Sequence, residues 1–436
     1  MGLDQINTTT ITTFLVKLTF CLLFTFPALP NALQSIVFLS FLLSLTIHRL
    51  LGKEFLSLDK SKFKVIIFLS GYYALYLICF LYETSTPFES SLLQSSILLA
   101  IVPFALVKFN FNILDEFRRI AVWVFTLSCL CLMFKLTNYW VEGVKLSHYY
   151  FKDKIDFGNF EDKNILQYIF TSSSEFIMSV SQWGYFQDNQ LIELNTHHTY
   201  ISAVLLLNII FILSSIKKSD IKFFITLKII ILLSLCLFIL YLDSKINVFL
   251  LGVFFSGLFL NLILQKSRMI LIFLVFTLIS TAIYNYHSIV SILNSALTEE
   301  SIRFNLYKKT LPLIKDNFYI GIGANNLSFS IDSLMSKDTS TYHYNFNSYE
   351  TLKTTHSQYL HYQLSGGVIL LISFLMTGIF ILYKLRGEVY AMNAFCIVFL
   401  NCLFEDFLTR SWGVYTFMLM LIYYWNFFEN KKNING

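Results

Sequence analysis

The fold of this chain is decided by residues 354–383, which read TTHSQYLHYQLSGGVILLISFLMTGIFILY. The first part of this stretch is polar and ends on Ser365-Gly366-Gly367. Val368 to Tyr383 then form an apolar run without a charged residue, which is typical of membrane-spanning helices. The stretch therefore predicts a membrane helix that is entered through a polar segment.

That polar segment closes a longer polar island, Thr298 to Gly367, in an otherwise apolar chain. Of the 436 residues, 56% are apolar and only 14% are charged, whereas about a quarter of the residues of a soluble domain are charged. We therefore expect an all-α integral membrane protein, because helices satisfy their own backbone polar groups in lipid. Lys and Arg lie in short loops and form no basic domain, so nucleic acid is not an expected partner.

The apolar runs predict about twelve spanning helices. They lie at 11–29, 31–50, 64–82, 91–109, 119–137, 198–216, 222–242, 246–264, 268–286, 367–384, 388–405 and 411–428. The chain is then expected to divide into five parts. These are five N-terminal membrane helices (1–137), a first outer loop (138–197), four membrane helices (198–286), a large outer loop (287–366), and three membrane helices with a short tail (367–436).

The short loops concentrate their Lys and Arg residues on one side of the predicted membrane. With the N-terminus inside, seventeen cations fall in inner loops, and only Lys245 and Arg410 fall in short outer connections. Cytoplasmic loops are those with an excess of Lys and Arg, so both termini are expected to be cytoplasmic. The inner cations are Arg49, Lys53, Lys60, Lys62, Lys64, Lys108, Arg118, Arg119, Lys217, Lys218, Lys222, Lys266, Arg268, Lys384, Arg386, Lys431 and Lys432.

This orientation places polar chemistry on the outer side. Seven of the eight histidines lie outside or at the outer rim, and only His48 lies inside. An outer site meets neither ATP nor nucleotide-sugars, and the sequence contains no ATP motif and no Asp-x-Asp pair. A transfer reaction there would need a donor that is already activated on a lipid carrier.

His356 is the first candidate for chemistry. Thr355 and Gln358 fit the capping-box pattern, Ser/Thr-x-x-Glu/Gln, which predicts a helix that starts at Thr355 with His356 in its first turn. The positive potential at a helix N-terminus lowers the pKa of a histidine and keeps it neutral near pH 7, as a general base requires. The alternative is a structural histidine at the membrane interface.

Two cations at the expected outer face are candidates for anion binding. Lys245 lies in a short turn between two spans, and Arg303 follows the acidic Glu299-Glu300. A cation at this depth can bind the phosphate of a lipid, although such side chains also snorkel to headgroups. His361 lies about 140° round a helix from His356, so the two histidines are not expected to share a metal.

Four places in the sequence resemble the O-antigen ligase/polymerase superfamily of bacterial envelope glycan enzymes. The first two are similar to the His-x-Tyr-hydrophobic motif with which a span of the family begins and to its Ser-Arg turn. The third is similar to an Arg that is followed by an apolar helix and a Gly-x-Gly turn. The fourth is similar to the family's His-Asn-x-Tyr-Leu…Glu-x-Gly signature. In this chain they read His198-Thr199-Tyr200-Ile201, then Asp243-Ser244-Lys245, then Arg303 with Leu311-Pro312-Leu313-Ile314 and Gly321-Ile322-Gly323, and finally Thr355-His356-Ser357-Gln358-Tyr359-Leu360 up to Gly367. On its own, the Gly321-Ile322-Gly323 segment predicts a tight turn.

The resemblance implies a metal-independent glycosyltransferase, without a cofactor, in the bacterial inner membrane. It would transfer a glycan from a polyprenyl (undecaprenyl) diphosphate to a hydroxyl of a lipid A-core or other glycan acceptor, at a periplasmic site and with inversion. His356 would be the general base, and Arg303 and Lys245 would bind the donor diphosphate. Supporting roles would fall to His198, Tyr200, Tyr359, Gly321 and Gly323.

Three departures from the family pattern stand out. Lys245 replaces the commoner Arg and offers a point charge without a bidentate fork. Ser357 replaces the usual Asn, and Ser365 stands where a Glu is frequent.

Two alternatives to a ligase stay open. An O-antigen polymerase uses the same donor, but polymerases tend to carry two comparable outer loops with Arg motifs, and Asn138–Thr196 contains no Arg. A transporter or flippase usually places ionisable residues near mid-membrane and has repeats. Here no repeat is visible, and only Lys17 and Lys228 interrupt the span interiors. Transfer to protein is less expected, since only Glu429–Gly436 follow the last span.

Overall fold

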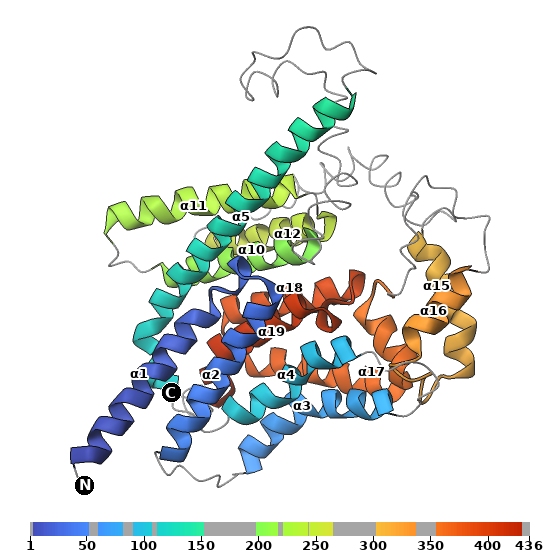
Figure 1. Ribbon diagram of the computed structural model, residues 1–436, viewed down its shortest axis with the longest axis horizontal. Coiled ribbons are helices and arrows are strands. Elements are labelled where there is room, and N and C mark those ends of the chain that lie inside the picture. Colours follow the sequence, from blue (N-terminus) through green and yellow to red (C-terminus); the bar gives the residue numbers. More distant parts are fainter. Residues whose placement is uncertain are drawn as a thin grey trace. The chain divides into compact units, whose positions relative to one another are not determined.

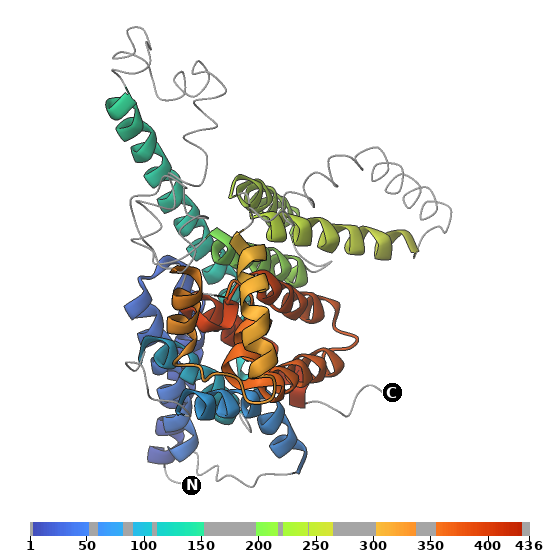
Figure 2. The same ribbon diagram turned by 90° about the vertical axis from the view of Figure 1, so that its right-hand side faces the viewer.

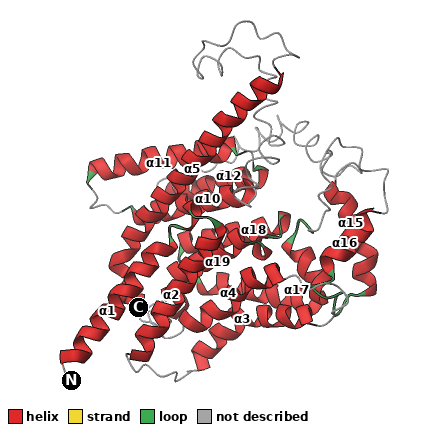
Figure 3. Cartoon of the chain, viewed as in Figure 1, coloured by secondary structure: helices red, strands yellow, loops and turns green. Residues whose placement is uncertain are grey.

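The computed structural model describes most of the predicted membrane helices. The described residues are 3–51, 60–81, 90–106, 111–151, 198–216, 221–242, 244–264, 302–336 and 355–429. Every regular element in these ranges is a helix (Figure 3). The expected all-α class is confirmed for this part of the chain.

Six of the described helices are long and apolar enough to cross a membrane. Five further apolar helices in the described ranges have 10–17 residues. The predicted count of twelve spans stays a prediction, and the span expected at 268–286 lies outside the described residues. The six long stretches are Ala32–Leu51, Phe63–Leu81, Glu116–Asn138, His198–Ser215, Lys222–Tyr241 and Gln358–Lys384.

The chain forms two compact units, of which the first comprises residues 1–48 and 113–242. Its helix α10 is buried along most of its length and packs against α5 and α11 (Figure 1). Phe24, directly after α1, packs with Phe125 of α5 and Phe211 of α10, with ring centroids 5.6–6.1 Å apart. The elements are α1 (Leu3–Leu23), η1 (Phe26–Ala28), α2 (Asn31–Leu51), η2 (Phe111–Leu114), α5 (Asp115–Phe151), α10 (His198–Ser215) and α11 (Lys222–Tyr241), of which α2 and η2 each run across a boundary between the units in the sequence.

Helix α5 is longer than the sequence predicts. The expected span ended at residue 137, where polar residues begin, but the helix continues to Phe151. Polarity ends the membrane-embedded part of a helix, not the helix itself, and no proline occurs between 138 and 151 to stop it. The start of the expected outer loop is therefore helical.

The second unit comprises residues 49–112 and 243–436. In it, α17 packs against α3 and α18, while α15 and α16 lie side by side at one end of α17 (Figures 1 and 2). Tyr72 of α3 meets Tyr362 and Phe374 of α17, and Tyr76 of α3 meets Tyr362, with ring centroids 5.6–6.0 Å apart. The elements are α3 (Lys60–Leu81), α4 (Ser90–Leu106), α12 (Lys245–Leu264), α15 (Ile302–Asp316), α16 (Leu327–Ser336), α17 (Gln358–Lys384), α18 (Val389–Phe404), η4 (Phe407–Thr409), α19 (Ser411–Tyr423) and α20 (Trp425–Glu429).

Helix α17 is broken at Gly366 and Gly367, where the backbone leaves helical angles. Lipid offers no hydrogen bonds to the carbonyl groups that such a break exposes. The Gly321–Gly323 turn supplies them, because the Ile322 amide donates to the Leu364 carbonyl at 2.7 Å and the Gly323 amide donates to the Ser365 carbonyl at 3.1 Å. Gly321 and Gly323 have φ of 75° and 85°, which confirms the predicted tight turn.

The turn and the broken helix approach so closely that neither has room for a side chain. A Cβ on Gly321 would lie 2.7 Å from the amide nitrogens of Gly366 and Gly367, and closer still to the Leu364 carbonyl oxygen. A Cβ on Gly367, whose φ is 67°, would overlap the Tyr319 carbonyl group. Both positions therefore require glycine for space and for conformation.

We expect Gly367→Ala to destabilise the protein by about 3 kcal/mol or more, since it adds left-handed strain to a backbone overlap. Thermal unfolding of the purified protein in detergent measures this loss. Gly252→Ala is the matched control, because nothing lies within 4 Å of a Cβ at this exposed position in α12. Equal stability of the two variants would contradict the close approach.

Candidate functional site

The first feature of the site is the turn Thr355-His356-Ser357, which leads into α17. Helix α17 begins at Gln358, and Ser357 is its N-cap, with its hydroxyl accepting from the Leu360 amide at 3.5 Å. The expected start at Thr355 is therefore wrong by three residues, and His356 precedes the cap instead of lying in the first helical turn.

The capping box fails because its two side chains have stronger partners elsewhere. The Thr355 hydroxyl donates to the Asp406 carboxylate. The Gln358 amide, from which this hydroxyl would accept in a capping box, donates to the Glu405 carbonyl at 3.2 Å. The Gln358 side-chain oxygen accepts from the Leu408 amide at 2.7 Å. Since these partners follow α18, tertiary contacts override the local capping pattern.

Asp406 holds the turn on both sides of His356. One carboxylate oxygen accepts from the Thr355 amide at 2.8 Å, and the other accepts from the Ser357 amide at 3.0 Å and from the Thr355 hydroxyl. Asp406 is 4% exposed, so these charge-assisted bonds form away from water. We call this set of bonds the Asp406 clamp.

The Asp406 clamp leaves His356 at the tip of the turn in a strained conformation. His356 has φ of 51°, and it is the single described residue other than glycine with a positive φ. Its side chain is half-buried. The left-handed region costs an L-residue about 1–2 kcal/mol, and residues held there concentrate at functional sites. A polar ring fixed at such a tip is suited to proton transfer.

A small core connects this turn to the helix that carries Arg303. Leu306 of α15 and Leu364 of α17 share that core with Leu327 and Ile331 of α16, and Leu360 packs against it. Leu306 follows Arg303 by three residues, about one helical turn. The core therefore brings the backbone of Arg303 to the His356 end of α17, while the Arg303 side chain lies outside the described part of the structure.

A buried amide pair connects Lys245 to the same region. The side chains of Asn247 in α12 and Asn401 in α18 exchange two hydrogen bonds, of 3.2 and 3.0 Å, and Asn247 also donates to the Ser244 hydroxyl at 3.0 Å. Asn401 stands in the last turn of α18, shortly before Asp406. Lys245 is the first residue of α12, and hydrogen bonds through Asn247 connect the start of this helix to the end of α18 that precedes Asp406. The side chain of Lys245 is not among those described.

The supporting residues fall into both units. The Tyr359 hydroxyl donates to the Phe399 carbonyl at 3.1 Å, so this side chain fixes the first turn of α17 on α18. Gly321 and Gly323 form the turn described above. His198 and the buried Tyr200 begin α10 in the first unit, whereas the residues of the clamp belong to the second.

His361 lies inside the helical core. It is 5% exposed, and its Nε2 lies 3.0 Å from the hydroxyl oxygen of Tyr76. His356, by contrast, sits in the turn before α17. The two histidines thus occupy different surroundings, and His361 packs with α3.

The sequence reading missed Asp406 as a functional candidate. The bonds of Asp406 reach 49 and 51 residues back along the chain, so no local spacing reveals them. Asp406 precedes η4 in the connection between α18 and α19, and the exposed cation Arg410 follows η4 in the same connection.

Comparison with known families identifies the segment that contains most of this site. Residues 191–375 match the family model described as O-antigen ligase. This segment is similar to the O-antigen ligase family. The match contains His198, Tyr200, Lys245, Arg303 and His356, and it ends before Asp406. The matched segment is therefore hydrogen-bonded to a carboxylate that lies outside it.

The match confirms the resemblance to the O-antigen ligase/polymerase superfamily. The match and the apolar helices together indicate a multi-pass membrane protein that is similar to a family of glycosyltransferase-like enzymes. Such enzymes act on lipid-linked glycan donors and on acceptors in the membrane. Among curated proteins, none matches the sequence.

We expect Asp406→Asn to loosen the turn that carries His356. The amide keeps one acceptor oxygen but loses the charge and the second acceptor, at a cost of about 1–3 kcal/mol. Hydrogen exchange followed by mass spectrometry should show faster exchange of the Thr355 and Ser357 amides.

Glu388→Gln is the matched control for this exchange experiment. Glu388 is an exposed carboxylate before α18 and makes no side-chain cap bond. Unchanged protection of the turn in Asp406→Asn would contradict the clamp.

Proposed function

We propose that the protein is an inverting glycosyltransferase of the O-antigen ligase type. It transfers a glycan from undecaprenyl diphosphate to a sugar hydroxyl of a lipid A-core acceptor, at the periplasmic face of the inner membrane. The observation that carries the proposal is the placement of His356. The segment that matches the O-antigen ligase family holds this ring at the tip of a turn, in a conformation that few non-glycine residues adopt.

In the proposed reaction, His356 is the general base. Its neutral imidazole takes the proton of the acceptor hydroxyl while the hydroxyl oxygen attacks the anomeric carbon of the donor sugar. The bond between that carbon and the diphosphate oxygen breaks, and the diphosphate leaves with the electron pair. Attack from the face opposite to the leaving group inverts the configuration of the sugar.

Arg303 and Lys245 are assigned to the leaving diphosphate, which gains negative charge as the bond breaks. Fixed cations stabilise this charge more in the transition state than in the ground state, which is the condition for catalysis. The assignment is supported by the small core that ties α15 to α17 and by the Asn247–Asn401 pair that ties α12 to α18. No metal or cofactor takes part in the proposed step.

An O-antigen polymerase is the second candidate, because it uses the same donor and differs only in its acceptor. The absence of Arg from Asn138–Thr196 favours the ligase. A deletion strain distinguishes the two by its lipopolysaccharide bands. Free carrier-linked polymer with bare core indicates a ligase, and core with a single repeat unit indicates a polymerase.

We expect His356→Ala to reduce glycan transfer by on the order of 10²–10⁴-fold, since a positioned general base contributes that much. Transfer is measured with purified protein and carrier-linked donor. His48→Ala is the control, because this histidine is expected on the inner side, where it contacts Thr12 at 3.0 Å. Normal transfer by a folded His356→Ala protein would exclude the base assignment.

Arg303→Ala should lower transfer on the order of 10²-fold, because one charge-stabilising donor is worth about that much. Varying the donor and the acceptor separately assigns the loss to one substrate. Lys315→Ala removes an exposed cation from the last turn of the same helix and should leave transfer unchanged. A defect confined to acceptor affinity would contradict the diphosphate role.

A further inference from the structure

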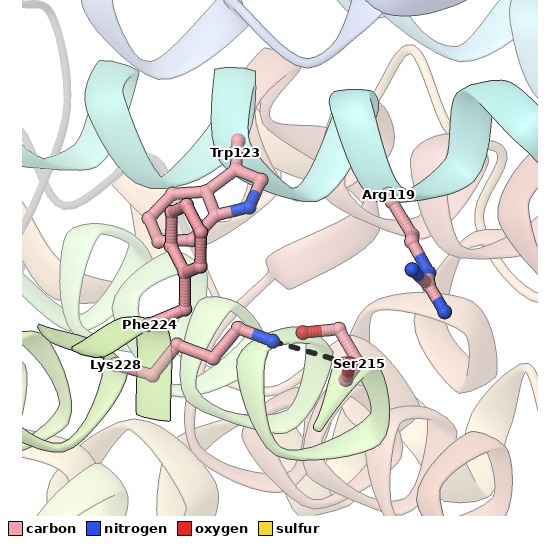
Figure 4. A pocket seen from close by; sticks show the side chains of 5 residues that line it. All are labelled: Arg119, Trp123, Ser215, Phe224 and Lys228. Atoms are coloured by element: carbon pink, nitrogen blue, oxygen red, sulfur yellow. Dashed lines mark hydrogen bonds between the residues drawn. The ribbon is translucent and has the colours of Figure 1, made fainter. Parts of the chain in front are cut away.

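The first unit contains a cationic cavity that the proposed reaction does not use. The cavity measures about 190 Å³ and lies between α5, α10 and α11 (Figure 4). It is lined by Arg119, Trp123, Ser215, Phe224 and Lys228. A water molecule occupies about 30 Å³ of liquid, so the cavity has room for an anion of several heavy atoms.

Lys228 is the buried cation of this cavity. It is 7% exposed, and its Nζ donates to the Ser215 carbonyl at 3.2 Å. Ser215 is the last residue of α10, where helix carbonyl groups carry partial negative charge and favour a cation. The ammonium group is therefore held at a fixed place on the cavity wall.

Arg119 provides the second positive charge, from α5. Its side chain is exposed, and Figure 4 shows it extending from α5 toward Ser215 at the cavity. The described lining contains no acidic residue that would neutralise the two cations. A guanidinium group and an ammonium group that line one cavity are favourable for a phosphate oxyanion, because both form charge-assisted hydrogen bonds with it.

The rest of the lining is apolar and aromatic. Trp123 extends from α5 and Phe224 from α11, and both side chains line the cavity (Figure 4). Phe224 is 45% exposed. Tryptophan side chains are enriched at the headgroup level of membrane proteins. Here Trp123 and Phe224 offer an apolar wall to the carbon atoms attached to a phosphate.

The cavity lies at the expected cytoplasmic ends of these helices. Arg119 stands near the start of α5, Ser215 ends α10, and Lys228 lies six residues, or roughly 9 Å, into α11. Lys17, the other cation that the sequence places within a span, lies 5.0 Å from the ring centroid of Phe117, also at the start of α5. Both lysines thus adjoin one end of α5, and basic pockets at this level bind anionic lipid headgroups.

We propose that this cavity binds a phosphate group, and that the phosphate belongs to an anionic phospholipid of the cytoplasmic leaflet. Lys228 and Arg119 bind the phosphate oxygens, and Trp123 with Phe224 contacts the glycerol and the first acyl carbons. The site is separate from the residues assigned to glycan transfer. It would connect α5, α10 and α11 through a bound lipid.

The test uses the full-length protein, purified in dodecyl maltoside with an equimolar mixture of phosphatidylglycerol and phosphatidylcholine. Native mass spectrometry counts the retained lipids, and thermal unfolding measures the stabilisation that each lipid gives. We expect the wild type to retain phosphatidylglycerol preferentially. Arg119→Gln, at an exposed position, should fold normally and bind this lipid at least about tenfold more weakly.

Lys222→Gln is the matched control, because Lys222 is an exposed cation in the first turn of α11 that does not line the cavity. It should retain phosphatidylglycerol as the wild type does. Equal retention by Arg119→Gln and Lys222→Gln would overturn the proposal.

A second arm replaces the lipid with millimolar inorganic phosphate. We expect little stabilisation, because the ion lacks the carbon atoms that contact Trp123 and Phe224. If inorganic phosphate stabilises the wild type as strongly as phosphatidylglycerol, and Arg119→Gln removes that effect, the cavity is a site for a soluble anion and the lipid assignment is wrong.

Discussion

The carboxylate of Asp406 is the contact on which the site depends. A turn of three residues at the start of a membrane helix has several backbone amides without helical partners. Asp406 accepts two of them, from Thr355 and Ser357, and its negative charge lies at the N-terminus of α17, where the helix dipole favours it. The same bonds impose the left-handed conformation of His356. Stability of the helix start and placement of the candidate base therefore have one cause.

The broken helix α17 illustrates a second constraint, which the membrane sets. A helix can depart from regular geometry in lipid only where other groups of the protein satisfy its backbone. The Gly321–Gly323 turn does so, and it approaches closely because it has no side chains at Gly321 and Gly323. The polar island is thereby fastened to α17 at two places: by this turn, and by the core around Leu306 and Leu364.

Apolar runs and motifs in the sequence were sufficient to predict the helical class, the family and the Gly321–Gly323 turn. These features depend on local residue types, so they can be read without a structure. The start of α17 was predicted at Thr355 and found at Gln358, because Asp406 and Leu408, about fifty residues away, take the side chains that would have formed the cap. Pairings between distant segments leave no periodicity in the sequence, and the importance of Asp406 could not be predicted for that reason.

The contacts of Ser357 and Ser365 show what these two departures from the family pattern do in the structure. Ser357, where an Asn is usual, still caps α17 through its side chain, and both residue types are good N-caps. Ser365, where a Glu is frequent, is fully buried at the break of α17, and its carbonyl accepts from Gly323. A carboxylate buried there would need a partner. A buried carboxylate is found at Asp406, bound to the turn that carries His356.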